Sequence, residues 1–282
     1  MAPAQIVNSR NLLNAALLLA VAGIAAFLYF RPKPAEEPSF KVSTLQPEQI
    51  SRIQVERPGS PPMILEKRGE SWFLTAPLAA RADVFKTRQL LDVATAASKQ
   101  RLPAEDLARF DLDKPVATLT LGTQVFRFGG INPLSQEQYL TTQDGVFPVP
   151  AYYGAALPAR AEDLVSRFPL ADDEIPVAFR LPAAELVRQA DGRWELKPAK
   201  QGLSQDDLNR WAEQWKFSAE QAMPAANTAA APETVSVTLK SGKTLAFRIA
   251  QREPQLVLLR EDEGMQYQFS KEAGNKLLDP GS

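Results

Sequence analysis

The 282-residue sequence contains no cysteine and no histidine. The chain therefore has no thiolate nucleophile, imidazole base, Ser-His-Asp triad or Cys/His metal site of its own. It also has little net charge, with 32 basic against 33 acidic residues, and so lacks the basic footprint of a nucleic-acid-binding protein. We expect no catalytic residues, no cofactor, no metal site and no nucleic-acid partner, and hence a protein that is not an enzyme.

The composition that remains is that of a globular protein, with 45% hydrophobic and 23% charged residues. The longest apolar run covers residues 12–30 and is interrupted by Asn14. As a helix it would be about 28 Å long, close to the ~30 Å hydrocarbon core of a bilayer. Arg10 precedes the run, Arg31 follows it, and aromatic residues gather at its far end. We expect residues 1–30 to form an uncleaved transmembrane anchor.

Two other interpretations of this run remain open. Ala20-Val21-Ala22 fits a signal-peptide cleavage site, but the apolar run continues for eight residues beyond it. A buried core helix is less favoured because the run is apolar on all sides. With a short N-terminus inside, the chain is predicted to be a single-pass protein of the cytoplasmic (inner) membrane with its bulk in the periplasm. Residues 31–44 contain prolines at positions 32, 34 and 38 and are expected to form a stalk.

The rest of the chain is interpreted as two copies of one unit, at residues 45–170 and 171–282. Each copy has a hairpin with a tryptophan in its second arm, and Trp72 and Trp194 lie 122 positions apart. Each hairpin precedes a helix, with Asp83 and Ser204 as the expected N-caps. The order predicts an α+β fold: an N-terminal transmembrane helix followed by two tandem, duplicated antiparallel-sheet-plus-helix domains.

The expected strands of the first copy are 50–56, 63–67, 72–75, 117–121, 124–128, 138–142 and 146–149. Those of the second copy are 177–181, 184–189, 194–197, 234–239, 244–249, 255–260 and 266–269. Each copy is expected to end in a short helix, at 161–167 and at 271–278. Residues 225–233 are low in complexity and are expected to be a loop inside the second copy.

Five residues are the candidates for contact with a ligand or partner: Gly129, Gly130, Asn132, Tyr152 and Tyr153. The segment 129–133 has the sequence Gly-Gly-Ile-Asn-Pro. It could form a backbone-lined anion cradle, although a turn that leaves a strand is the commoner role of such a run. The two tyrosines follow the last strand of the first copy and could be either a contact surface or core.

Other motifs favour structural roles. Ser241-Gly-Lys-Thr244 resembles the end of a phosphate loop, but the glycine that the pattern requires is replaced by Val237 inside a strand, which favours a hairpin turn. The acidic clusters at 111–113, 172–174 and 261–263 are expected to be solvated turns. A carboxylate-based hydrolase would need two acids facing each other about 5–10 Å apart.

Two tryptophans in the second copy also have two interpretations. Trp211 and Trp215 lie four residues apart on the apolar stripe of the expected helix. They could stack on a sugar, but packing of the helix against its sheet is favoured.

The motifs of the first copy carry a family resemblance. They are Trp72-x4-Pro77, Ala82-Asp83, Phe110-Asp-Leu-Asp113-x-Pro115, Thr118-Leu-Thr-Leu121, Phe128-Gly-Gly-x-Asn-Pro133, Tyr139 and Asp144-Gly145-Val146. With them, residues 45–165 resemble the bacterial domain-of-unknown-function family 4340, and the second copy shows a fainter echo. The sequence departs from the family at Asp111, where glycine is usual.

This resemblance implies a membrane-anchored protein made beside ABC transporters of the gliding-motility type and their auxiliary subunits. It supplies no catalytic residues. The expected function is a membrane-anchored extracytoplasmic accessory or scaffold protein. Its expected partner is an ABC transporter permease, an auxiliary subunit or another envelope protein, contacted through sheet edges or the groove between the domains. The alternative is a periplasmic ligand-binding module for an envelope glycan or lipid.

Overall fold

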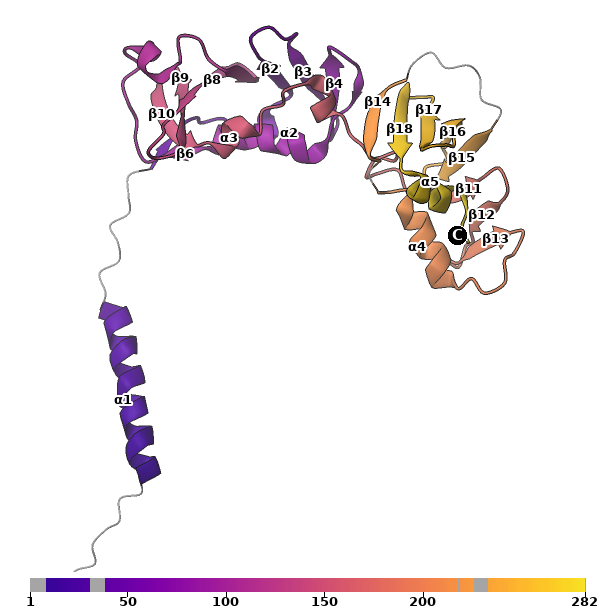
Figure 1. Cartoon of the computed structure of the whole chain (residues 1–282), viewed down its shortest axis with the longest axis horizontal. Coiled ribbons are helices and arrows are strands. Elements are labelled where there is room, and N and C mark those ends of the chain that lie inside the picture. Colours follow the sequence, from indigo (N-terminus) through magenta and orange to yellow (C-terminus); the bar gives the residue numbers. More distant parts are fainter. Residues whose placement is uncertain (1–8, 31–38, 218, 226–232, 282) are drawn as a thin grey trace, which may run out of the picture. The chain divides into compact units, whose positions relative to one another are not determined.

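The computed structural model describes residues 9–30, 39–217, 219–225 and 233–281 (Figure 1). The chain divides into two units, Met1–Pro38 and Ser39–Ser282. In the first unit, helix α1 (Ser9–Phe30) contains the apolar run, as expected. Among the described residues, no helix combines the length and apolarity that a membrane crossing requires, and the anchor stays a prediction. Residues 31–38 of the expected stalk and 226–232 of the expected loop lie outside the described residues.

The unit from Ser39 contains two eight-stranded antiparallel sheets, so the mixed α and β fold is confirmed. The first sheet is ordered β10-β9-β8-β7-β2-β3-β4-β5 and the second β13-β12-β11-β15-β16-β17-β18-β14. The strands of the first sheet are β2 (Arg52–Glu56), β3 (Met63–Arg68), β4 (Ser71–Ala76), β5 (Ala80–Arg81), β7 (Ala117–Leu121), β8 (Gln124–Ile131), β9 (Glu137–Thr142) and β10 (Gly145–Pro150). Those of the second are β11 (Pro176–Arg180), β12 (Glu185–Arg188), β13 (Trp194–Lys197), β14 (Gln221–Pro224), β15 (Thr234–Leu239), β16 (Thr244–Gln251), β17 (Leu256–Arg260) and β18 (Met265–Phe269).

The two sheets repeat one strand order. In both sheets, the first three strands of the repeat lie in reverse chain order and are followed by four strands in chain order. The matching strands are β4-β3-β2-β7-β8-β9-β10 and β13-β12-β11-β15-β16-β17-β18. The sheets differ at their ends, where β5 extends the first and β14 extends the second. The sequence did not indicate either extra strand, because segments of two and four residues are too short to show an alternating pattern. We call the two halves the first and second repeat.

The main helix of each repeat begins at the predicted N-cap. In α2 (Val84–Leu91), the Asp83 carboxylate accepts a hydrogen bond from the Lys86 N–H at 2.9 Å. In α4 (Gln205–Gln214), Ser204 and Asp207 form a reciprocal capping box. These side chains satisfy N–H groups that have no partner inside the first helical turn.

The tryptophans of the second repeat belong to the core, as favoured from their spacing. Trp211 lies in α4 and is 4% exposed, and Trp215 directly follows the helix and is fully buried. Phe179 of β11 packs between them, with ring centroids 4.9 Å from Trp211 and 5.5 Å from Trp215. The Trp211 Nε1–H donates to the Lys276 carbonyl at 2.7 Å. This packing leaves neither ring face free for a sugar.

The second pair of matching helices differs from the expected pair. Residues 161–164 form only a 3-10 turn, Ala161–Leu164, rather than the expected helix over 161–167. The counterpart of α5 (Lys271–Leu278) is instead α3 (Tyr152–Ala155). Helix α3 directly follows β10 as α5 directly follows β18. The sequence hid this match because α3 has no side-chain N-cap and is only one turn long.

A glycine in each of these helices confirms the match. Gly154 comes five residues after Val149, which pairs with Gln138, and a Cβ on Gly154 would collide with the Gln138 side chain. Gly274 likewise comes five residues after Phe269 of β18, which pairs with Leu256. A Cβ on Gly274 would lie 2.5 Å from the Leu256 Cβ. Both helices therefore approach the adjacent strand closely, and only glycine permits it.

A segment before each repeat also packs against it. In the first repeat, β1 (Phe40–Lys41) pairs with β6 (Ala97–Ser98), and Val42 is fully buried. In the second repeat, the Ala219 N–H donates to the Arg167 carbonyl at 2.8 Å, and Leu170 is buried. The segment 167–175 thus belongs to the packing of the second repeat.

Substitution of Gly274 by Ala should destabilise the second repeat. The added methyl group cannot avoid the Leu256 Cβ, and overpacking of this kind destabilises by roughly 1–3 kcal/mol. The better helix propensity of Ala offsets about 1 kcal/mol of that. We expect a net loss of up to about 2 kcal/mol in the free energy of unfolding in urea. Asn275→Ala, on the exposed side of the same helix, is the control, and an equal effect of both variants would contradict the close approach.

Candidate functional site

The five predicted contact residues gather at one end of the first sheet. Gly129 and Gly130 lie near the end of β8, and Asn132 follows that strand. Strand register places Ile131 beside Gln138 and Pro150 beside Glu137. The loop after β8 and helix α3, which follows Pro150, therefore leave the sheet at the same end.

The space in front of the two glycines is filled by the chain itself. A Cβ on Gly129 would collide with the Phe110 carbonyl and lie 2.8 Å from Leu112, and one on Gly130 would collide with the Asp111 carboxylate. Asp111 has a φ of 55°, in the left-handed region where glycine is unstrained, and it is the position at which the family resemblance expects glycine. This close approach accounts for both glycines without a bound anion.

Asn132 holds the following loop in a fixed turn. Its Oδ1 accepts hydrogen bonds from the N–H groups of Leu134 at 2.9 Å and Ser135 at 3.3 Å. Its Nδ2 donates to the Tyr139 hydroxyl at 3.0 Å. The turn leaves the Leu134 side chain 94% exposed, and Ile131 just before it is 54% exposed.

The two tyrosines occupy different environments. Their ring centroids lie 4.3 Å apart, but Tyr152 is 62% exposed whereas Tyr153 packs against the core. Burial raises the pKa of Tyr153, and its hydrogen bond to Tyr152 raises it further, so the phenol stays neutral. We call Ile131, Leu134 and Tyr152 the apolar end of the first sheet.

Gln138 connects the two parts of this site and was missed by the sequence analysis. It is buried in β9, where its Nε2 donates to the Gly129 carbonyl at 2.9 Å and its side chain meets Gly154. A glutamine at an inward-facing position among apolar residues is the only signal that could have indicated it.

Backbone groups at several sheet edges already have partners in the chain. The Gln205 side chain accepts from the Trp194 N–H and donates to the Trp194 carbonyl of β13, both at 2.8 Å. Leu102 forms the same two-way bridge with Val146 of β10, at 2.8 and 3.0 Å. Strand β5 has two residues, and β14 ends in Pro224. These features protect a sheet from added strands and leave little edge for docking.

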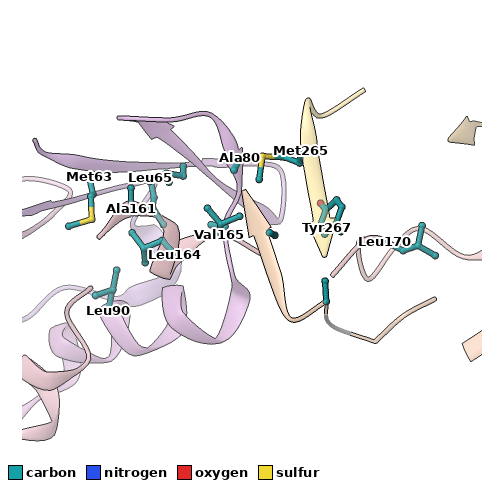
Figure 2. Close-up of a cluster of buried hydrophobic side chains, with 14 of the residues drawn as sticks. Met63, Leu65, Ala80, Leu90, Ala161, Leu164, Val165, Leu170, Met265 and Tyr267 are labelled. Atoms are coloured by element: carbon teal, nitrogen blue, oxygen red, sulfur yellow. The ribbon is translucent and has the colours of Figure 1, made fainter. Parts of the chain in front are cut away.

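A charged cluster joins the two repeats. The Arg81 guanidinium of β5 donates to Glu263 at 2.5 Å and to the Phe168 carbonyl at 2.6 Å. It also donates to the Tyr267 hydroxyl at 3.1 Å, and that hydroxyl donates to Glu263 at 2.9 Å. Figure 2 shows the buried apolar side chains of this region, among them Ala80, Met265 and Tyr267.

Arg260 is the most deeply buried charge of this cluster, with a side chain 2% exposed. It donates to both carboxylate oxygens of Glu174 at 2.5 and 2.7 Å, to Asp262 at 2.8 Å and to the Pro169 carbonyl at 2.7 Å. Asp262 is also bonded to Lys243 at 2.8 Å. The charges of the cluster cancel, as buried charges require. Its three acids are Glu174, Asp262 and Glu263, and its three bases are Arg81, Lys243 and Arg260.

This cluster corrects the expectation of solvated turns for one acid in each of the groups 172–174 and 261–263, whereas Asp172, Asp173 and Glu261 are exposed as expected. The side chains of Glu174 and Glu263 are only 13% and 16% exposed. Burial acts to raise the pKa of Glu174, but hydrogen bonds and charge attraction from Arg260 outweigh it and lower the pKa. The pKa of Asp262 is lowered in the same way, against burial, by Arg260 and Lys243. These acids are held ionised and paired, which suits a structural contact and not proton transfer.

Two adjoining hollows lie between α4 and α5. The larger, about 300 Å³, is lined in part by Phe217, Ala273 and Leu277. The smaller, about 160 Å³, includes Trp211 in its wall and shares Lys276 with the larger one. Each hollow has a single carboxylate in its lining, so neither offers the facing pair of acids of a hydrolase.

A protein-family model described as "Domain of unknown function (DUF4340)" matches residues 72–262. The match covers more than half of the chain, and the protein belongs to this family. It begins in the hairpin of the first repeat and ends in the second, so it extends past the 45–165 over which the motifs were noted. No curated protein and no solved structure matches the chain significantly.

Replacement of Arg260 by Met should strongly destabilise the protein. The change leaves Glu174 buried without its cation, and breaking a buried pair in this way destabilises by about 3–5 kcal/mol. We expect this loss in the free energy of urea unfolding. The double variant Arg260→Met, Glu174→Met should recover part of it, because no unpaired charge remains. Arg210→Met, at an exposed pair, is the control, and a loss there as large as at Arg260 would contradict the assignment.

The cluster should also make stability fall in acid. Because the pKa of Glu174 is lowered in the folded state, the unfolded chain binds more protons once the pH drops below about 5. The stabilisation is complete above the unfolded pKa and is lost as pH falls through the folded one. In melting curves from pH 7 to pH 2, Glu174→Gln should melt lower at pH 7 and show a shallower acid decline. Glu70→Gln, at a fully solvated carboxylate, should follow the wild-type curve, and parallel curves for all three proteins would refute the linkage.

Proposed function

We propose that this protein is a membrane-anchored extracytoplasmic accessory or scaffold protein without enzymatic activity, which docks on an ABC-type transporter or another envelope complex. The apolar run of residues 12–30 supports the anchor. The transporter as partner rests on what the family resemblance implies, and fold-level analogy alone does not define a function.

The observation that carries the docking proposal is the apolar end of the first sheet. Its three side chains are held outward by a structured loop and a helix, with Leu134 almost completely exposed. Exposed apolar side chains on a rigid support are typical of protein contact surfaces, because they bury area on binding with little loss of conformational freedom. The protected sheet edges favour docking through these side chains over strand addition.

The envelope glycan or lipid module has less support as an alternative. Its expected stacking rings, Trp211 and Trp215, are both buried in the core. Gly129 and Gly130 of the 129–133 loop are likewise packed against residues 110–112.

Native co-purification tests the proposal. Tagged full-length protein is extracted from its own membranes in mild detergent, and stoichiometric companions are identified by mass spectrometry. We expect transporter or other envelope subunits, and we expect Leu134→Asp combined with Tyr152→Asp to reduce their recovery more than about tenfold. Both side chains are exposed, so the variant should melt like the wild type.

Val84→Asp combined with Phe85→Asp is the matched control, because it places the same two charges at other exposed apolar residues of the first repeat. Recovery of the protein alone in several detergents would count against an envelope partner. Equal loss with the control variant would remove the apolar end from the proposal.

A further inference from the structure

One residue that lines the larger hollow between α4 and α5 corresponds to a much larger side chain in the first repeat. Ala273 lines the hollow and directly precedes Gly274, the glycine that packs against β17. At the same place in the first repeat, Tyr153 directly precedes Gly154, which packs against β9. A tyrosine ring therefore stands in one repeat where a methyl group stands in the other.

The surroundings of the two positions also correspond. Asp92 and Glu213 each come nine residues after the N-cap of their helix, Asp83 and Ser204. Tyr153 packs against the core, and Asp92 at the end of α2 is close enough for its charge to act on the phenol. The hollow is likewise lined by Gln214, next to Glu213 at the end of α4. In both repeats the site lies between the end of the main helix and the helix that carries the glycine.

The walls of the empty site suit an aromatic ring. Phe217 and Leu277 supply apolar surface, and Phe217 is 62% exposed beside the opening. Lys276 stands on the rim, with its ammonium 2.9 Å from Glu272. An ammonium beside a ring is attracted by the electron-rich face, and the Lys276–Glu272 pair offers both donor and acceptor to a phenol or indole.

We infer that this hollow receives an aromatic side chain from the docking partner. Its charged pair, Lys276 and Glu272, can bind such a ring, and the corresponding residue of the first repeat, Tyr153, is itself aromatic. The inference rests on the proposed function, since it names the chemistry of the partner. Tyrosine and tryptophan are the side chains that most often carry the binding energy of protein interfaces, inserted into pockets that exclude water. The partner thus supplies to the second repeat an aromatic ring, which the first repeat has in its own chain as Tyr153.

The test fills the hollow with the ring of the first repeat. Full-length protein in detergent, with isotope-labelled alanine and leucine methyl groups, is titrated with p-cresol, which has the chemistry of a tyrosine side chain. We expect saturable NMR shifts of the Ala273 and Leu277 methyl groups. Ala273→Tyr should abolish the shift at Leu277, because the new ring occupies the site. Cyclohexanol derivatives of the same size should bind at least about fivefold more weakly, since they lack the ring face.

Asn275→Tyr is the matched control, because it adds the same ring to an exposed position of α5 that does not line the hollow. It should retain the p-cresol shifts. Absence of saturable shifts in the wild type, or equal binding of the cyclohexanol derivative, would overturn the inference. Melting curves establish that Ala273→Tyr folds; if it does not, Phe217→Ala, which removes one wall, should weaken p-cresol binding instead.

Co-purification separates this inference from the proposed function. If the hollow receives an aromatic side chain, Ala273→Tyr should reduce partner recovery more than about tenfold and Asn275→Tyr should not. Full recovery with Ala273→Tyr would overturn the inference and leave the proposed function standing. Failure of the wild type to recover any partner would instead count against the proposed function itself.

Discussion

The buried ion pair between Arg260 and Glu174 is the contact on which the tandem arrangement depends. Arg260 comes from the end of β17, whereas Glu174 and the Pro169 carbonyl come from the segment that joins the repeats. A guanidinium removed from water must have such partners, so the joining segment is held against the second sheet. That position places the Phe168 carbonyl where Arg81 of the first repeat binds it, and Glu263, which is paired with Arg260 in the turn after β17, binds Arg81 as well.

Because charge contacts of this kind have strict geometry, they specify how the repeats meet more narrowly than apolar packing alone would. A bidentate pair tolerates little rotation, and Arg81 binds both carboxylate oxygens of Glu263 across the repeats, beside the buried residues Ala80, Val165 and Met265 (Figure 2). The repeats are also not joined through their outer edge strands, β13 and β10, where Gln205 bonds the backbone of Trp194 and Leu102 bonds that of Val146. Side-chain surfaces are therefore what each repeat can present to another protein.

Local signals predicted most of the fold. Alternating residues located β7 and β15 with correct bounds, and the caps Asp83 and Ser204 located the main helices. Helix α3 and the strands β5 and β14 were missed because they are too short for periodicity to show. The paired acids were misinterpreted for another reason: Glu174 and Arg260 are 86 residues apart, and a sequence shows charge in a loop without showing its partner. For the candidate site, the motif 129–133 was located, but the burial of Gln138 and the packing of residues 110–112 depend on tertiary contacts.

The repeated strand order explains how a contact inside one repeat can become a site in the other. Both repeats must keep the glycine that lets α3 or α5 approach its neighbouring strand, since any Cβ there meets Gln138 or Leu256. The residue before that glycine differs between the repeats: Tyr153 packs against the core of the first, and Ala273 lines the hollow of the second. Tyrosine at this position stabilises the first repeat by burying a ring. Alanine leaves the hollow of the second repeat open. Its apolar walls are then buried only when another molecule supplies a ring, so we expect the hollow to be filled only in the complex with a partner.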